Sequence, residues 1–147
     1  MILKQLIKRA TNNVEEGVLC VAEAQTPSVP FEIKRVYYTC GVEAGVTRGH
    51  HAHKELEQLL ICPHGEISVQ MDDGKGGIET VILNDSSQGL YVGPLMWHTM
   101  TWNKSDSVLL VLASDHYKED DYIRSYEDFL SITTKEGRKE NFSKNRR

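Results

Sequence analysis

The chain has 147 residues and a formal net charge of −4, from 17 Lys and Arg against 21 Asp and Glu. A hydrophobic fraction of 39% with 26% charged residues excludes a largely disordered chain. The net acidity argues against a nucleic-acid partner, and without an apolar run of about 18 residues we expect no membrane partner. The sequence therefore predicts one domain over residues 1–147.

The N-terminal segment and the cysteines indicate the compartment. Residues 1–11 are too short and too charged for a signal peptide. Cys20, Cys40 and Cys62 occur singly, without CxxC spacing, which is typical of unpaired thiols in a reducing compartment. We therefore expect a cytoplasmic protein.

Residues 31–40 predict the first clear strand, because they are rich in β-branched and aromatic side chains. Alternation along a strand places Arg35 and Tyr37 on one face and Val36 and Tyr38 on the other. The glycines that follow predict a loop up to about residue 49.

Later segments predict further short strands, at residues 56–62, 66–71, 78–83, 89–92 and 107–113, and the histidine-rich segment 48–54 is also considered as a strand. The run Asp-Asp-Gly-Lys-Gly-Gly at 72–77 is a hairpin signal between two of them. The continuous apolar run at 107–113 indicates a strand covered on both faces. At least seven short strands at regular turn spacing favour an all-β antiparallel sandwich or barrel.

The C-terminal segment changes period. In residues 122–132 the apolar side chains fall on one face of a helix, and either Asp120 or Asp121 is expected to cap its start. Basic residues gather from 138 to 147, and we expect a flexible tail from about residue 134. The sequence thus predicts a single all-β domain with a short C-terminal helix.

Three histidines lie together in the segment RGHHAH at residues 48–53. On a strand, His51 and His53 share one face and His50 points to the other. Two imidazoles on one face indicate either two metal ligands or an acid/base pair, and a pair of exposed histidines without a role is the alternative. Another histidine, His98, follows a turn later in the chain.

The spacing of these residues resembles the two motifs of the cupin superfamily. The resemblance is carried by His51, His53, Gln58, Gly65, Gly89, Pro94 and His98. It implies a double-stranded β-helix, or jelly roll, with the site in its lumen. Metal-bearing cupins carry Glu where this chain has Gln58, and a neutral amide is a poor metal ligand. Glu57 faces the other side of the strand and cannot replace it, so we expect neither a metal nor another cofactor.

Longer strings narrow the resemblance to one family. They are FEIKRVYYT at 31–39, RGHHAHKELEQLLICPHGEISVQMDDG at 48–74, GLYVGPLMWHTM at 89–100 and VLLVLASDHYKEDDYIRSYEDF at 108–129. Together they are similar to the nucleotide-sugar 3,4-ketoisomerases, small cupins that act on dTDP-4-keto-6-deoxy-D-glucose. A departure lies at Glu15-Glu16-Gly17, where many relatives have Arg-Gly.

This resemblance implies an isomerase that works without a metal and forms a homodimer with strands exchanged between subunits. Its product is a dTDP-3-keto-6-deoxyhexose, the precursor of 3-amino-3,6-dideoxyhexoses for surface glycans such as a lipopolysaccharide O-antigen or an S-layer glycan. The sequence does not indicate whether the product has the galacto or the gluco configuration at C4.

Moving a ketone from C4 to C3 requires a base that takes the C3 proton and an acid that protonates C4. Histidine suits this role because its ordinary pKa is close to the working pH. We expect either His51 or His53 to be the base, with the other polarising a carbonyl or hydroxyl. Tyr37 is the candidate acid or oxyanion donor, and strand packing is its alternative role.

The diphosphate of the substrate requires cations, and the best placed are Arg35 and Arg48, for which surface salt bridges are the alternative. Trp97 is expected to stack on the base or cover the lumen, although Trp102 and core packing are alternatives. The predicted substrate-binding residues are thus Arg35, Arg48, Gln58, Trp97 and His98.

Other functions remain open at this point. One is a metal-dependent cupin enzyme that uses His51, His53 and His98. A second is a cupin that binds a small ligand without turnover. A third is a 3,5-epimerase acting on the same nucleotide sugar, which is also a cupin with a histidine base.

Overall fold

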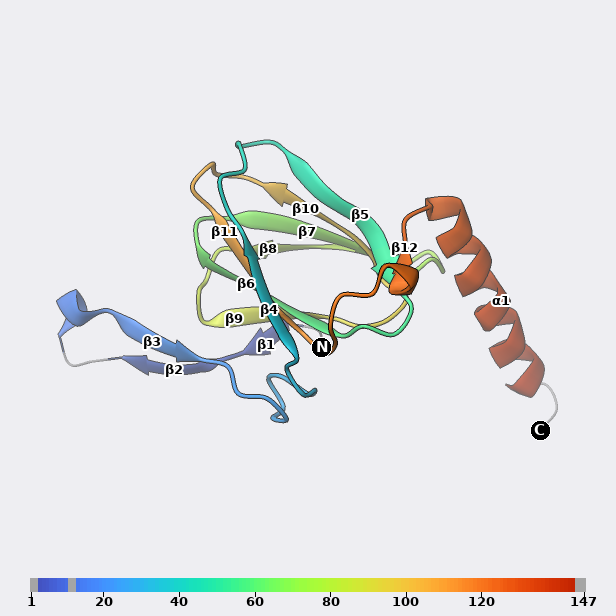
Figure 1. The fold of residues 1–147 in the computed structure, drawn as a ribbon, viewed down its shortest axis with the longest axis horizontal. Helices are drawn as coiled ribbons and strands as arrows, with labels where there is room; N and C mark the ends of the chain where they lie inside the picture. The colour runs from blue at the N-terminus through green and yellow to red at the C-terminus, as the bar shows by residue number, and fades with distance from the viewer. Residues whose placement is uncertain (1–2, 11–12, 145–147) are drawn as a thin grey trace.

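Two antiparallel sheets of five strands each face one another in the computed structural model, which describes residues 3–10 and 13–144 (Figure 1). The first sheet has the order β1 (Leu3–Gln5), β9 (Gln88–Val92), β6 (Gln58–His64), β11 (Val108–Ala113) and β4 (Arg35–Thr39). The second has the order β12 (Tyr122–Ile123), β5 (Thr47–His53), β10 (Trp97–Trp102), β7 (Ile67–Asp72) and β8 (Ile78–Leu83). The predicted all-β fold is confirmed.

The remaining elements extend from this sandwich. A hairpin of β2 (Ile7–Ala10) and β3 (Val18–Val21) projects from one end, and α1 (Tyr126–Lys144) projects from the other (Figure 1). Two short 3-10 turns, η1 (Val14–Glu16) and η2 (Glu119–Asp121), complete the described elements. Helix α1 covers most of the predicted tail, whose last residues, 145–147, lie outside the described part of the chain. No helix of the described residues has the length and apolar character that a membrane span requires.

Apolar side chains from both sheets fill the space between them. Leu60 and Leu90 of the first sheet pack with Val69 and Trp102 of the second, and all four are buried. The Trp102 indole N–H donates to the carbonyl of Ser107 at 3.0 Å, so its one polar group is satisfied inside the core. This packing holds the two sheets together through the centre of the sandwich.

A second apolar layer covers the outer face of the first sheet. Val111 packs in the central core, whereas its neighbour Leu112 packs against Phe31 on the opposite face. The strand at 107–113 is therefore covered on both faces, as its continuous apolar run predicts. Chain segments before β4 supply this cover, with Leu6, Val29 and Phe31 among its residues. The strand predicted over residues 31–40 begins later, at Arg35.

The predicted helix over 122–132 is wrong at its start. Tyr122 and Ile123 instead form β12, which pairs antiparallel with the end of β5, and the helix begins at Tyr126. Pairing with a free strand edge satisfies the backbone groups of two residues that would otherwise form the first helical turn. Apolar spacing alone does not separate these outcomes.

The expected helix cap is wrong as well. Neither Asp120 nor Asp121 caps α1. The Ser125 hydroxyl accepts a hydrogen bond from the Asp128 N–H at 3.3 Å, which is the role of a helix N-cap. The carboxylate of Asp121 instead binds backbone N–H groups of the turn after β5.

Candidate active site

Three histidine rings meet inside the sandwich, at adjoining positions of β5 and β10. His51 lies opposite His98 in the strand register, and the centroids of their rings are 4.8 Å apart. The ring of His53 lies 5.0 Å from that of His51. His53 and His98 are each 2% exposed, and His51 is partly buried. Alternation along the strand thus places His51 and His53 on one face, and that face is the inner one.

A β-bulge in β5 lies directly before His51 and includes His50. The register with β10 shifts between His98 and Thr99, and Gly49 and His50 both have positive φ angles, of 98° and 57°. As a result His50 is exposed whereas His51 points inward. A Cβ at Gly49 would lie 2.9 Å from the carbonyl oxygen of His98, so glycine is needed there.

We expect Gly49→Ala to destabilise the protein more than Gly45→Ala. Both glycines have positive φ, but a Cβ at Gly45 meets nothing within 4 Å. Each variant therefore incurs about 1–2 kcal/mol of backbone strain, and only Gly49→Ala adds a clash with the His98 carbonyl. Urea denaturation of both variants measures the difference. Equal losses in free energy of unfolding would contradict the proposed close approach.

Tyr37 and Gln58 form a hydrogen-bonded pair on the first sheet, Tyr37 on β4 and Gln58 at the start of β6. The Gln58 amide nitrogen donates to the Tyr37 hydroxyl oxygen at 2.8 Å, which leaves the hydroxyl proton free to donate elsewhere. Burial raises the pKa of Tyr37 to about 12, so the hydroxyl keeps its proton near pH 7. The Gln58 carbonyl oxygen is buried and has no partner among the described residues. Of this pair, the Tyr37 hydroxyl is the group that lines a cavity, where it presents a donor.

Burial keeps the three inward histidines neutral. It lowers the pKa of His51, lowers that of His53 to about 4 and lowers that of His98 to about 3. The Nδ1 atom of His98 lies 3.0 Å from the carbonyl oxygen of Met96. Because a carbonyl oxygen only accepts hydrogen bonds, Nδ1 carries the proton and is the donor. A neutral imidazole carries one lone pair, so each ring can accept a hydrogen bond or a proton, but the lowered pKa makes it a weaker base than a free imidazole.

The lowered pKa values predict that stability rises with pH. In the unfolded chain these histidines regain a pKa near 6.5 and bind protons that the folded chain does not bind. The free energy of unfolding should therefore decrease as the pH is lowered from 7 to 5, by more than about 1.4 kcal/mol, the equivalent of one pKa unit. Urea titrations at pH 7, 6 and 5 test this, and a flat profile would contradict it.

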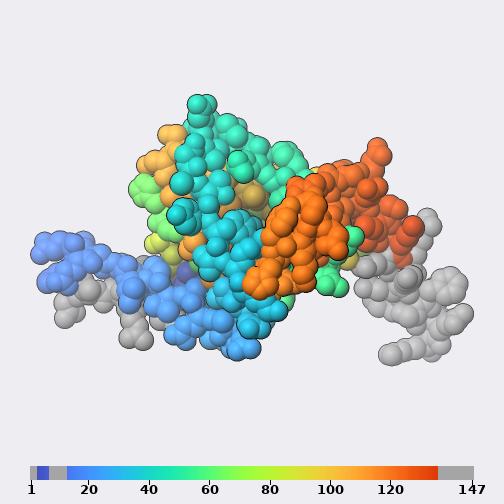
Figure 2. Space-filling model, viewed as in Figure 1, coloured from blue at the N-terminus to red at the C-terminus, as the bar shows by residue number. Residues whose placement is uncertain are grey.

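Two cavities open along the edge of the sandwich between β4 and β5. The larger has a volume of about 340 Å³, and its lining includes Arg35, Tyr37, Arg48 and His51. Its floor reaches Trp102. Four of the predicted site residues therefore share one cavity. Figure 2 shows the orange segment that precedes α1 lying against the cyan strand β4 at this edge.

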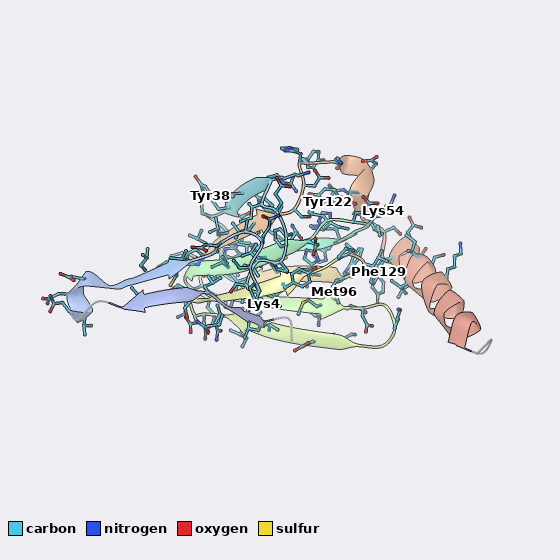
Figure 3. The ribbon with its side chains drawn as sticks, turned by 90° about the horizontal axis from the view of Figure 1, so that it is seen from below. Lys4, Tyr38, Lys54, Met96, Tyr122 and Phe129 are labelled. Atoms are coloured by element: carbon cyan, nitrogen blue, oxygen red, sulfur yellow. The ribbon has the colours of Figure 1, made fainter. Side chains whose placement is uncertain are left out.

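The smaller cavity, of about 180 Å³, is lined by His53, Asp121 and Tyr122, and Arg35 lines both cavities. Tyr122 also borders the larger cavity and so stands between the two. In Figure 3 Tyr122 lies beside Lys54, at the end of β5. His51 and His53 therefore border different cavities, although their ring centroids are only 5.0 Å apart.

The structure does not bring Trp97 into this site. Trp97 precedes His98 on β10 and consequently points to the outer face of its sheet, where its ring lies 5.3 Å from that of Tyr126 and 5.7 Å from that of Phe129. Its packing there joins the start of α1 to the sandwich. Neither His98 nor Gln58 lines these two cavities: Gln58 contacts Tyr37 and His98 contacts His51, which do.

Sequence reasoning missed three residues of this region. Asp121 contacts His53, with Oδ2 at 3.2 Å from Nδ1. Tyr122 divides the cavities, and the Arg124 guanidinium lies 4.2 Å from the centre of its ring. Arg124 also lines the larger cavity and forms an ion pair with Glu119 at 2.8 Å. All three residues lie in the segment DDYIR at 120–124. Their proximity to the site can be predicted only if this segment is taken as extended and not as the start of a helix.

A metal site of the kind found in many cupins needs several side-chain donors directed at one point. No group of three or more His, Cys, Asp or Glu side chains in the described ranges is arranged to hold a metal ion. The amide nitrogen of Gln58 donates to Tyr37, and this neutral side chain supplies no anionic ligand at the position where metal-bearing cupins carry a carboxylate. The side chains present therefore do not fit a resident metal.

A jelly-roll sandwich with a cluster of histidines in its lumen defines a cupin. Residues 3–134 match the family model FdtA, described as WxcM-like, C-terminal. The chain belongs to this family, that of the TDP-sugar 3,4-ketoisomerases, and is therefore an isomerase.

Individual relatives support this assignment. The chain is 47% identical over 115 residues to the TDP-4-oxo-6-deoxy-alpha-D-glucose-3,4-oxoisomerase of Aneurinibacillus thermoaerophilus, covering 78% of this chain and 82% of that one. The structure is similar to that of the sugar 3,4-ketoisomerase QdtA from Thermoanaerobacterium thermosaccharolyticum in complex with TDP, with a TM-score of 0.84, 40% identity and coverage of 91% and 94%. It is also similar to the TDP-quinovose 3,4-ketoisomerase WlaRB of Campylobacter jejuni, with a TM-score of 0.80, 42% identity and coverage of 88% and 95%.

Proposed function

We propose that the chain converts dTDP-4-keto-6-deoxy-D-glucose to a dTDP-3-keto-6-deoxyhexose with its own side chains as acid and base. The observation that carries this proposal is that His51, a neutral imidazole, and Tyr37, a phenol that keeps its proton, line the same cavity. An enediol isomerisation requires one group of each kind at adjacent atoms of the sugar. The names of the relatives support the choice of sugar.

In the proposed reaction, His51 takes the proton from C3 and the electron pair of that bond forms the enediolate. Tyr37 donates its proton to the developing oxyanion at O4. The imidazolium of His51 then returns its proton at C4, and the O3 proton passes to the Tyr37 oxygen as the C3 ketone forms. The net change is one proton moved from C3 to C4 and one from O3 to O4, with no oxidant or reductant.

His53 has a different role in this proposal. Its Nε2 atom is buried and has no partner among the described residues, whereas its Nδ1 atom faces Asp121. A neutral ring held in this way accepts a hydrogen bond through Nε2. We assign His53 to a sugar hydroxyl, which it polarises and orients while His51 acts on carbon.

Three arginines give the same cavity the charge that a diphosphate requires. Arg35, Arg48 and Arg124 line it, and guanidinium groups bind phosphate oxygens through paired hydrogen bonds. The Nε atom of Arg35 is buried without a partner among the described residues, which leaves a donor for the ligand. We propose that these side chains hold the diphosphate at the open edge, with the sugar directed towards His51.

We further propose that the chain acts as one cupin domain in a homodimer that exchanges strands. Val18 and Leu19 of the projecting hairpin are 48% and 59% exposed, and Val36 and Tyr38 on the edge strand β4 are 56% and 69% exposed. Apolar surface of this extent on an edge strand is typical of an interface. Analytical ultracentrifugation tests this, and a monomer at micromolar concentration would contradict it.

We also propose the compartment in which the enzyme works and the use of its product. The three cysteines are free, which supports a cytoplasmic enzyme. The 3-keto product is a substrate for amination, and this supports a role in making 3-amino-3,6-dideoxyhexoses for surface glycans such as an O-antigen or S-layer glycan.

A proton NMR time course of the protein with dTDP-4-keto-6-deoxy-D-glucose in D₂O, with and without chelator, tests the proposed function. We expect signals of a 3-keto sugar that appear equally in both samples, and the coupling of H4 distinguishes galacto from gluco product. Unchanged substrate would contradict the proposal and favour a ligand-binding cupin. Turnover that chelation abolishes would favour a metal-dependent enzyme.

A further inference from the structure

We infer that Asp121 is a positioning residue, which fixes the tautomer of His53 so that Nε2 is the acceptor offered to the sugar. This inference rests on the proposed function, in which His53 contacts a sugar hydroxyl. It assigns a part in the reaction to a segment that lies 68 residues after His53 in the chain.

The contact between the two side chains determines where the imidazole proton lies. Oδ2 of Asp121 is 3.2 Å from Nδ1 of His53, and a carboxylate only accepts hydrogen bonds. In the neutral ring the proton therefore lies on Nδ1, and Nε2 carries the lone pair. His53 is 2% exposed, so water does not compete for either nitrogen as it would at the surface.

The carboxylate itself is held in place by the backbone that follows β5. Its Oδ1 atom accepts the N–H of Glu55 at 2.9 Å, and its Oδ2 atom accepts that of Leu56 at 3.4 Å. The carbonyl of Asp121 accepts the N–H of Lys54 at 2.9 Å. Asp121 is thereby fixed to the same turn that follows His53, so the distance between the two side chains does not depend on a mobile loop.

The pairing of β12 with β5 continues this arrangement. Tyr122, next to Asp121, lies opposite His53 in the register, and their ring centroids are 4.4 Å apart. The imidazole is therefore held at one edge by the carboxylate and along its side by an aromatic ring. Arg35 is the cation that faces His53, and it opposes ring protonation, whereas Asp121 favours it.

The variant Asp121→Asn separates positioning from a structural role in the turn. The asparagine oxygen can still accept the N–H of Glu55 and so keeps the shorter of the two contacts with the turn, whereas the contact of 3.4 Å with the Leu56 N–H is lost. The amide N–H faces Nδ1 of His53 and cannot accept a proton from it. The ring is then driven to the opposite tautomer, with hydrogen on Nε2. We expect kcat to fall by at least about 100-fold, with KM changed by less than about threefold, because shape and charge at the diphosphate are unaltered.

Long-range ¹H–¹⁵N correlation spectra of protein labelled with ¹⁵N-histidine read the tautomer without substrate. We expect the Nδ1–H form of His53 in the native protein and the Nε2–H form in Asp121→Asn. The matched control is Asp106→Asn, which alters the exposed pair of Asp106 and His64, 3.0 Å apart, and should leave kcat unchanged.

The two measurements also separate this inference from the proposed function. If the native protein shows the Nδ1–H tautomer of His53 but does not turn over the sugar, the proposed function is overturned. The contact between Asp121 and His53 would still fix the tautomer in that case. An Nε2–H tautomer in the native protein would overturn the inference. So would an Asp121→Asn protein that loses kcat with the tautomer unchanged, or one that changes tautomer and keeps the native kcat.

Discussion

Replacement of His51 by asparagine is expected to lower kcat by at least about 1,000-fold while the protein still binds the nucleotide sugar. His51 is the histidine of the cluster that lines the larger cavity together with Tyr37. Asparagine keeps a polar side chain of moderate size at this position but cannot take a proton from carbon. Isothermal titration with the substrate gives the affinity, and loss of the C3 proton signal in D₂O gives the rate.

The neighbouring residue provides a matched control for this variant. His50 is exposed because the bulge turns it away from the lumen, so His50→Asn should retain the native kcat. If His51→Asn kept its turnover and His53→Asn lost it, the assignment of the base would be reversed. Since burial lowers the pKa of His51, the acidic limb of kcat/KM should have its midpoint below pH 6.5.

The parts of the site that the sequence predicts are those set by the alternation of a strand. Arg35 and Tyr37 on β4, and His51 and His53 on β5, share an inner face because alternate residues of a strand must do so. The same rule places Trp97 opposite His98, on the outer face. Its predicted role of stacking on the base or covering the lumen rested on its aromatic side chain and not on this rule, and the structure does not place it there.

The remaining parts depend on long-range pairing, which no local pattern indicates. Residues 122–123 form a strand only because the edge of β5 is available, and their apolar side chains fit a helical pattern equally well. The carboxylate of Asp121 then accepts a backbone hydrogen bond from the turn after β5 instead of capping the helix. The separation of His51 and His53 into two cavities follows from the position of Tyr122, which the helical interpretation places elsewhere.

Tyr37→Phe is the second substitution expected to have a large effect, and we expect kcat to fall by about 100-fold or more. The hydroxyl of Tyr37 is the proposed donor to the oxyanion at O4, and removal of one such donor commonly costs about 10²–10³ in rate. The variant also leaves the amide nitrogen of Gln58 without its 2.8 Å acceptor. We therefore expect the free energy of unfolding to fall by about 1–3 kcal/mol.

Tyr38→Phe is the control for this effect, because it removes the same hydroxyl from the next residue of β4. Tyr38 is 69% exposed and lies at the periphery of the molecule (Figure 3), and phenylalanine keeps the aromatic ring that the proposed dimer interface would use, so both kcat and stability should match the native protein. Stopped assays of 3-keto product and urea denaturation measure the two quantities. If Tyr37→Phe lost stability but kept its kcat, Tyr37 would serve only to satisfy Gln58, and another group would have to protonate O4. If it lost kcat while Tyr38→Phe did not, proton donation from the inner face of β4 would be supported, because the same hydroxyl is removed from opposite faces of one strand.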